Sequence, residues 1–227
     1  MQNGLTGNAD LFGLAGAEIK GAIFDLDGVL VDTAKYHYLA WKRLAREYGF
    51  DFTEEENERL KGVSRMRSLE ILLAIGKITL SKTQMEAAAA AKNAWYVEHL
   101  FSMDDTAILP GSKEYLARLR DAGIPLALGS TSKNAQFILD RLNIAGFFDA
   151  VLDGNYVIRG KPDPLIFLKA AAALGVSPKN CVVFEDALAG VEAAKAGFMR
   201  VIAVGAKESL PGADRYVNSL ADMQAKA

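Results

Sequence analysis

Two aspartates, Asp25 and Asp27, stand two residues apart directly after a short apolar run, and Gly28 follows them. The run, residues 21–24, predicts a buried strand of an α/β sheet, so both carboxylates would lie at its carboxyl end, where open sheets bind their ligands. An ionised Asp25 can serve as a nucleophile, and Asp27, whose side chain points in another direction, can transfer protons. Gly28 allows a sharp turn around a ligand. The motif therefore predicts covalent chemistry on a carboxylate.

Two loops farther along the chain carry groups that suit a bound phosphate. Residues 129–134, among them Ser130, place small hydroxyl and amide side chains after an apolar run and before a helix. Such a loop can hold a phosphate, and without further motifs it is better explained as an ordinary helix start. A phosphate dianion that approaches Asp25 is repelled by its charge, so a fixed cation is required. Lys161, which precedes a proline-stiffened turn, is the candidate, although a lone lysine in a loop is usually just solvated.

A second acidic pair, Glu185 and Asp186, ends the apolar run 182–184. Alone, the pair is explained equally well as the start of a helix. Several carboxylates that converge with a phosphate oxygen form a hard-cation site, and Mg²⁺ fits it best. We expect Asp25, the backbone carbonyl of Asp27, and Asp186 to bind the ion directly. Glu185 would bind it directly or through water.

The sequence between these motifs predicts the elements that must position them. Apolar residues at helical spacing, with Gly49 as a stop, predict a helix over 36–48, and further helical patterns make the segment 33–103 nearly all helical. From residue 109 onward strands and helices alternate, which indicates a parallel sheet. The remaining predicted helices are 54–60, 68–75, 81–100, 112–121, 134–142 and 165–174, and the remaining predicted strands are 125–128, 148–152, 181–184 and 201–204.

One predicted strand precedes the helical block and the others follow it. We therefore predict an α/β fold in which residues 20–32 and 104–227 form a doubly wound, Rossmann-like parallel sheet domain. An all-helical cap domain, 33–103, is inserted into it, and the cleft between the two domains is the expected site. Residues 1–19 are predicted to be a loose N-terminal extension.

The composition is that of an ordinary soluble globular protein. The 227 residues are 51% hydrophobic and 24% charged with a net charge of -2, so nothing favours nucleic acid or an anionic membrane as a partner. No stretch is long and apolar enough to span a bilayer, and the opening segment lacks the charged start of a secretion signal. The lone cysteine, Cys181, abuts an apolar run, which favours a structural, reduced thiol. We expect a cytoplasmic protein, with a monomer as the default state.

Taken together, the motifs resemble those of the haloacid dehalogenase superfamily. Its four motifs correspond here to Asp25 with Asp27, to Ser130, to Lys161, and to Glu185 with Asp186. The resemblance covers about residues 22–204. It implies a Rossmann-like core with a cap and a requirement for Mg²⁺. It also implies that the first aspartate becomes a phosphoaspartate and that the second acts as the acid/base.

Within that superfamily, the cap sequence resembles the β-phosphoglucomutase branch. The resemblance is carried by 32–37, Trp41, 60–65, Ser68, and Lys92 with Asn93. It implies a mutase that interconverts β-D-glucose 1-phosphate and glucose 6-phosphate, with glucose 1,6-bisphosphate as intermediate and activator. The bisphosphate must turn around, so two phosphate sites are needed; Arg65 would bind the distal phosphate, and His37 would orient Asp27 and couple cap closure to catalysis. The implied substrate-binding residues are Thr33, His37, Trp41, Leu60, Gly62, Val63, Ser64, Arg65, Ser68, Lys92, Thr131, Ser132, Lys133 and Asn134.

Two other functions remain open. The nearest is a phosphatase for a hexose phosphate or another small phosphate ester, with the same core and a cap that admits water. A non-catalytic sugar-phosphate sensor is an alternative of another class, since fold alone does not decide function. Taken singly, His37 and Trp41 are ordinary half-buried or core residues and Arg65 is a solvated charge. The stretch 154–159 differs from the branch pattern, which leaves the sugar preference open.

Overall fold

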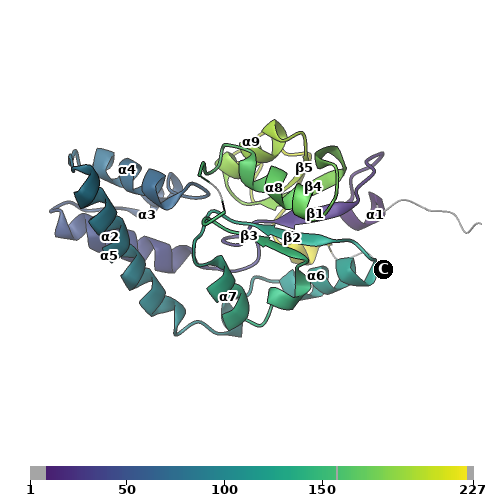
Figure 1. Ribbon diagram of the computed structural model, residues 1–227, viewed down its shortest axis with the longest axis horizontal. Helices are drawn as coiled ribbons and strands as arrows, with labels where there is room; N and C mark the ends of the chain where they lie inside the picture. The colour runs from purple at the N-terminus through teal and green to yellow at the C-terminus, as the bar shows by residue number, and fades with distance from the viewer. Residues whose placement is uncertain (1–8, 157, 224–227) are drawn as a thin grey trace, which may run out of the picture.

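The computed structural model describes residues 9–156 and 158–223. Its centre is a six-stranded sheet of order β3-β2-β1-β4-β5-β6, in which every neighbouring pair is parallel (Figure 1). The strands are β1 (Gly21–Phe24), β2 (Leu126–Gly129), β3 (Ala150–Leu152), β4 (Cys181–Glu185), β5 (Arg200–Val204) and β6 (Arg215–Val217). Phe24 pairs with Leu128 on one side and with Phe184 on the other. The residues that follow β1, β2 and β4 therefore meet at one edge of the sheet.

The two faces of the sheet are covered by different helices. Ala22 and Phe24 of β1 pack into one apolar cluster with α6 and α7, while Ile23 packs into a second cluster with α8 and α9. This alternation follows from the two-residue period of a strand, and burial of both faces explains why the strands are continuously apolar. Figure 1 shows the two helix pairs on opposite sides of the sheet. These helices are α6 (Ser112–Asp121), α7 (Ala135–Arg141), α8 (Leu165–Ala173) and α9 (Leu188–Ala196).

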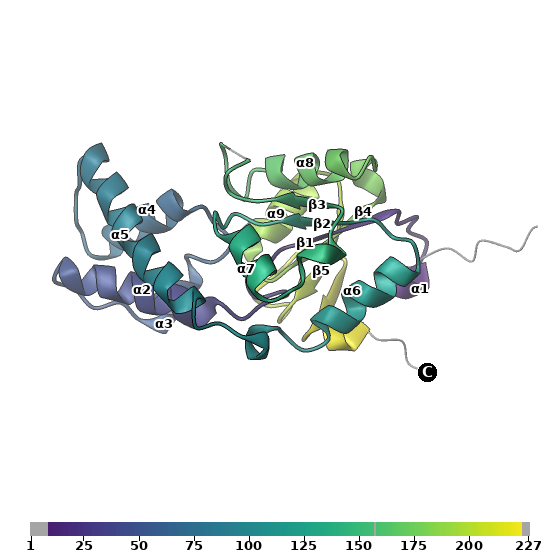
Figure 2. The same ribbon diagram turned by 60° about the horizontal axis from the view of Figure 1, so that its bottom comes forward.

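Four further helices lie between β1 and β2 in the sequence and beside the sheet domain in space (Figure 2). They are α2 (Ala34–Glu47), α3 (Glu54–Glu58), α4 (Arg65–Ile75) and α5 (Lys82–Leu100). Trp41 of α2 packs with Leu69 and Leu72 of α4 in an apolar cluster of their own. Tyr96 and Leu100, near the end of α5, instead join a cluster of the sheet domain and anchor the cap on it. The predicted fold class, a doubly wound parallel sheet with a helical cap, is confirmed.

The observed elements differ from the predicted ones mainly at their ends. α4 begins at Arg65, three residues earlier than predicted, because the Ser64 side chain caps it by accepting a hydrogen bond from the Arg67 N–H. The strand predicted over 148–152 is limited to β3. The sequence does not predict β6, because three residues are too few to show a strand pattern. Among the helices that the structure describes, none has the length and apolarity to cross a bilayer.

The N-terminal segment packs against the core where the structure describes it. A short helix, α1 (Ala9–Phe12), precedes β1, and its last residue is fully buried in a cluster of the sheet domain. The carbonyl oxygen of Phe12 accepts a hydrogen bond from the Arg215 guanidinium at 2.6 Å. The prediction of a loose extension over 1–19 is therefore wrong for its second half, because apolar side chains there cover one end of the core. Residues 1–8 lie outside the described residues.

Candidate active site

A buried lysine joins two of the predicted acids. Asp25 follows β1 and Glu185 ends β4, and the parallel register of these strands places the two carboxylates side by side. Lys161, in the loop before α8, donates from Nζ to Asp25 Oδ1 at 2.5 Å and also donates to Glu185 Oε1. Burial acts to lower the pKa of Lys161, but the charges of the two carboxylates outweigh it and raise that pKa. The site thus contains a permanent cation beside Asp25, where an approaching phosphate needs one.

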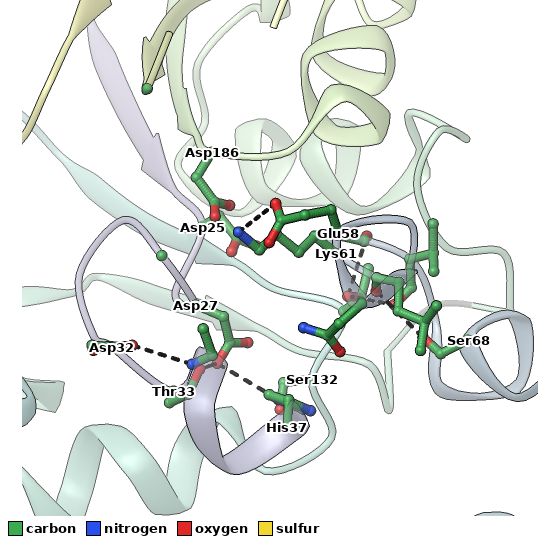
Figure 3. A pocket seen from close by; sticks show the side chains of 18 of the residues that line it. Asp25, Asp27, Asp32, Thr33, His37, Glu58, Lys61, Ser68, Ser132 and Asp186 are labelled. Atoms are coloured by element: carbon green, nitrogen blue, oxygen red, sulfur yellow. Dashed lines mark hydrogen bonds and ion pairs between the residues drawn. The ribbon is translucent and has the colours of Figure 1, made fainter. Parts of the chain in front are cut away.

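The acids at this sheet edge also form a group that can hold a metal ion. One carboxylate oxygen each from Asp25, Glu185 and Asp186 lies within 4.8 Å of the others, and Figure 3 shows Asp25 and Asp186 side by side. Burial, together with the charges of Glu185 and Asp25, raises the pKa of Asp186 well above its usual range. Three carboxylates face one ammonium, so two negative charges are left over. A dipositive ion with a preference for oxygen ligands balances them, and the residues present therefore fit Mg²⁺.

Two glycines allow the chain to pass close to these acids. Gly28 has φ +80, and a Cβ at this position would lie 2.0 Å from Asp186 Oδ2. A Cβ at Gly190 of α9 would lie 2.0 Å from the Glu185 carboxylate. Any side chain at either position would have to displace an acid of the cluster. The sequence predicts the need for glycine only at Gly28, where it expects a turn.

Asp27 lies apart from this acid cluster and faces the cap. Its Oδ1 accepts a hydrogen bond from the Thr33 hydroxyl and lies 3.9 Å from His37 Nε2 (Figure 3). Burial and the charge of Asp25 raise the pKa of Asp27 to about 6. A carboxyl group with this pKa can both hold and release a proton near neutral pH, which is what a general acid/base needs. Its carboxylate is not part of the metal-binding group, so its predicted metal contact rests on the backbone carbonyl alone.

A pocket of about 420 Å³ lies between the sheet edge and the cap. It brings together most of the predicted site residues. Those that line it are Asp25, Asp27, Thr33, His37, Trp41, Leu60, Gly62, Val63, Arg65, Ser68, Lys92, Thr131, Ser132, Lys133, Asn134 and Asp186.

Four predicted residues do not line the pocket: Ser64, Ser130, Lys161 and Glu185. Lys161 and Glu185 lie directly behind Asp25, as described above. Ser130 is buried, and its hydroxyl oxygen accepts a hydrogen bond from the Ser132 N–H at 3.1 Å. The prediction that Ser64 binds substrate is not supported, because its hydroxyl caps α4.

The cap side of the pocket contributes two cations. Lys92 is buried, and its Nζ lies 2.9 Å from Nδ1 of His37. Burial, and then the charge of Arg65, lower the pKa of Lys92 well below its usual range. Arg65 is half-buried and forms no ion pair with an acid among the described residues. Two cations this close without an acid between them favour the binding of an anion.

The cap and the core touch on two sides of the pocket. The Thr131 hydroxyl donates a hydrogen bond to the carbonyl oxygen of Val63 at 3.3 Å. On the other side, Asn134 Nδ2 donates to Asn93 Oδ1 at 2.9 Å. The first contact joins the core loop 129–134 to the turn before α4, and the second joins the same loop to α5. Both contacts bring the cap against the core beside the pocket.

Several lining residues were missing from the predicted site, among them Lys61 and Glu58. Lys61 forms an ion pair with Glu58, with 2.8 Å between Nζ and Oε2, and its charge acts to lower the pKa of Asp186. Lys61 thus adds a positive charge near the metal-binding group. The sequence could have indicated Lys61 as a site residue, because it lies in the basic turn before α4. Nothing in the sequence distinguishes Glu58 from the other acids of α3.

Because carboxylates are crowded in this site, we expect the stability of the protein to depend on pH unless a divalent cation is bound. Burial raises the pKa of Glu185 to about 7, and that of Asp27 to about 6, so the folded protein keeps protons that the unfolded chain has released. Stability falls with pH wherever the folded state binds more protons. In metal-free buffer these acids therefore favour a fall of the melting temperature from about pH 5 to about pH 8, while the lowered pKa values of His37 and Lys92 act in the opposite direction. Added Mg²⁺ should reverse this fall.

Calorimetry at several pH values, with and without Mg²⁺, measures this effect. Sodium chloride at equal ionic strength is the control for simple screening of charge. A rise of the melting temperature on addition of Mg²⁺ that does not grow with pH would contradict the arrangement described here.

Comparison with known proteins identifies the family. A family model described as "haloacid dehalogenase-like hydrolase" matches residues 19–197. The chain belongs to this family. The match spans the acid motifs after β1 and β4, Lys161 and the whole cap, and the predicted resemblance to the haloacid dehalogenase superfamily is confirmed.

Individual members of the haloacid dehalogenase-like family narrow the resemblance further. Beta-phosphoglucomutase of Bacillus subtilis is 42% identical over 207 residues, which are 90% of this chain and 92% of that protein. A phosphorylated carbohydrates phosphatase of Thermotoga maritima is 34% identical over 189 residues, 82% of this chain and 85% of that protein. The crystal structure of beta-phosphoglucomutase from Clostridium difficile has a TM-score of 0.87 at 39% identity and covers 91% of this chain and 93% of its own. The resemblance to the β-phosphoglucomutase branch is confirmed, and the relatives include both a mutase and a phosphatase.

Proposed function

We propose that the protein is a Mg²⁺-dependent sugar-phosphate mutase that interconverts β-D-glucose 1-phosphate and glucose 6-phosphate through glucose 1,6-bisphosphate. The observation that carries the proposal is the presence of cations at two places around one pocket, behind Asp25 and on the cap side. Lys161 lies beside Asp25, while Arg65 and Lys92 lie on the cap side. A bisphosphate has an anionic group at each end, so it needs a cation at each end.

In the proposed reaction, a free hydroxyl of the sugar monophosphate attacks the phosphorus atom of the phosphoaspartate at Asp25. Asp27 takes the proton of that hydroxyl, the bond from phosphorus to Asp25 breaks, and glucose 1,6-bisphosphate forms. After the bisphosphate has turned around, Asp25 attacks its other phosphorus atom, the bond from that phosphorus to the sugar oxygen breaks, and Asp27 gives its proton to that oxygen. Lys161 stabilises the negative charge on the phosphoryl group in both steps.

The acid cluster supports a resident Mg²⁺ ion. Asp25, Glu185, Asp186 and the backbone carbonyl of Asp27 would hold it. The ion would neutralise charge on the nucleophile and on the phosphoryl oxygens. Ser130, Thr131 and Lys133 are proposed to hold the transferring group from the core side, and Arg65 to hold the distal phosphate.

The decisive experiment follows two products at once. The protein is incubated with Mg²⁺, a trace of glucose 1,6-bisphosphate and β-glucose 1-phosphate, and both glucose 6-phosphate and free phosphate are measured. The proposal predicts glucose 6-phosphate as the main product. α-Glucose 1-phosphate is the matched control substrate and should react poorly. Free phosphate as the dominant product would show a phosphatase instead, and neither product would show a non-catalytic protein.

The phosphatase alternative has its own support, because a phosphatase of phosphorylated carbohydrates is among the relatives. It would use the same Asp25 and Asp27, with water in place of the sugar hydroxyl. The contacts Thr131–Val63 and Asn134–Asn93 favour the mutase, because they hold the cap against the core, as the exclusion of water from a phosphoaspartate requires. A small sugar phosphate is the proposed partner in either case. The cytoplasmic location and the monomeric state stay predictions.

Replacing Arg65 by alanine separates the two proposed phosphate sites. We expect Arg65→Ala to lower the rate of isomerisation by about 100-fold, because the bisphosphate loses the cation that holds its distal end. Hydrolysis of p-nitrophenyl phosphate, which has no second phosphate, should change less than about threefold. Arg67→Ala is the matched control, since Arg67 lies in the same helical turn but is exposed and paired with Glu70. Equal losses of both activities in Arg65→Ala would contradict the role.

A further inference from the structure

A buried cation without an acidic partner lies behind the proposed acid/base. Lys92 has no carboxylate within 4.0 Å among the described residues. Its Nζ forms a hydrogen bond with Nδ1 of His37 at 2.9 Å. Its ammonium lies 4.5 Å from the ring centre of Trp41 and 4.7 Å from that of Tyr96. Two aromatic faces therefore offset part of the cost of burying this charge.

The position of Lys92 decides which nitrogen of His37 carries the proton. When Lys92 is protonated, its ammonium has only N–H donors, so Nδ1 of His37 accepts. Burial and the charges of Lys92 and Arg65 lower the pKa of His37 well below its usual value, which keeps the ring neutral. The single ring proton is then on Nε2, the atom that lies 3.9 Å from Asp27 Oδ1. The N–H group of His37 consequently faces Asp27.

Tyr96 is the residue that touches both members of this pair. Its ring stacks on the imidazole of His37, with 4.0 Å between ring centres and 28° between planes, and it also forms one wall for Lys92. Tyr96 follows Lys92 by one turn of α5, so the helix itself aligns the two side chains. The residue is fully buried, and its hydroxyl lies close to the Thr33 side chain without a well-formed hydrogen bond among the described residues. The contacts of Tyr96 with His37 and Lys92 are made by its ring.

We propose that Tyr96 is a positioning residue for the acid/base Asp27, acting through His37 and Lys92. Its ring holds the imidazole and the ammonium in the one arrangement that directs the Nε2–H of His37 at Asp27. Without the ring, the imidazole can turn and Lys92 loses half of its aromatic surroundings. This inference rests on the proposed role of Asp27 in protonating the leaving oxygen of the sugar.

The test compares two substrates that differ in their need for an acid. A sugar phosphate has a poor leaving group that must be protonated, whereas the leaving group of p-nitrophenyl phosphate needs no proton. For Tyr96→Leu we expect kcat/KM for the sugar phosphate to fall at least about tenfold, while that for p-nitrophenyl phosphate falls less than about threefold. Tyr96→Phe keeps the ring and should be within about threefold of the wild type on both substrates. Equal losses on both substrates in Tyr96→Leu, or a Tyr96→Phe variant as poor as Tyr96→Leu, would overturn the proposal.

Tyr115→Leu is the matched control for simple loss of stability. Tyr115 is also fully buried, but it packs on Phe24 and Phe184 of the sheet domain. The Tyr115→Leu variant should lower the melting temperature without changing the ratio of the activities on the sugar phosphate and on p-nitrophenyl phosphate. Nitrogen NMR of the imidazoles gives a second readout, because the chain has only two histidines. His37 should be the Nε2–H tautomer in the wild type and lose that preference in Tyr96→Leu; an unchanged tautomer would contradict the role.

Asp27→Asn separates this inference from the proposed function. If Asp27 is the acid, its replacement must reduce turnover of the sugar phosphate far more than that of p-nitrophenyl phosphate. If Asp27→Asn shows no such difference, the proposed role of Asp27 has failed. If the loss is larger on the sugar phosphate than on p-nitrophenyl phosphate in Asp27→Asn but not in Tyr96→Leu, the positioning role of Tyr96 alone has failed.

Discussion

Asp25→Asn is expected to abolish phosphoryl transfer, with a loss of at least about 10⁴-fold in kcat. An amide is a far weaker nucleophile than a carboxylate, and no other carboxylate can replace it. Glu185 is bound to Lys161 and to two backbone N–H groups, and Asp27 faces the cap. The expected loss is therefore close to complete for sugar phosphates and for p-nitrophenyl phosphate alike.

The stability of Asp25→Asn should behave differently from its activity. The substitution removes one of three crowded negative charges and leaves Lys161 paired with Glu185. In metal-free buffer, the melting temperature should be equal to that of the wild type or higher. Mass spectrometry of the intact chain after incubation with a phosphoryl donor should show one added phosphoryl group in the wild type and none in the variant. Asp121→Asn, at an exposed position, is the control for loss of a carboxylate. Retention of more than about a hundredth of wild-type activity would contradict the role of Asp25.

Lys161→Met is expected to damage both activity and stability. Its ammonium is the buried cation shared by Asp25 and Glu185, and its side chain is fully shielded from solvent. Removing one member of a buried ion pair leaves an uncompensated charge, which costs about 3–5 kcal/mol of unfolding free energy. Loss of the cation beside the transferring group should lower kcat by about 10³-fold.

The dependence on pH distinguishes this loss of stability from a packing defect. Without Lys161, the carboxylates repel one another when ionised and are relieved when protonated, so the variant should be destabilised more at high pH than at low pH. Thermal denaturation across pH measures this trend. Lys179→Met, which removes an exposed lysine, should match the wild type. A loss of stability that is independent of pH would show that Lys161 contributes packing rather than charge.

The sheet domain was largely predictable because its signals are local. A parallel strand that is buried on both faces must be continuously apolar, and a polar residue at its end must lie at the sheet edge. These rules placed Asp25, Ser130 and Glu185 at the ends of β1, β2 and β4, as the structure has them. Such patterns need no knowledge of distant contacts. The predictions failed where the pattern was short, as for β6, or where burial came from distant residues, as for Phe12.

Roles on the cap side depended on contacts that no local pattern encodes. Ser64 and Arg65 are adjacent in the sequence, yet the hydroxyl of one caps α4 while the guanidinium of the other lines the pocket. The division follows from the capping hydrogen bond, which decides where α4 begins. In the same way, Lys92 and His37 are 55 residues apart and become partners only because α2 packs against α5.

The sequence by itself determined where Asp25 and Asp27 lie, as carboxylates at the end of a buried strand, and it predicted their proposed chemistry from the other motifs of the family. Residue type and strand pattern are sufficient for that inference, because both are written in consecutive residues. Only the tertiary structure decided how the two acids divide the work. Asp25 shares Lys161 and the metal-binding group, whereas Asp27 faces Thr33 and His37. The difference arises because the direction of a side chain after a strand, and the charges that then shift its pKa, are set by elements that arrive from elsewhere in the chain.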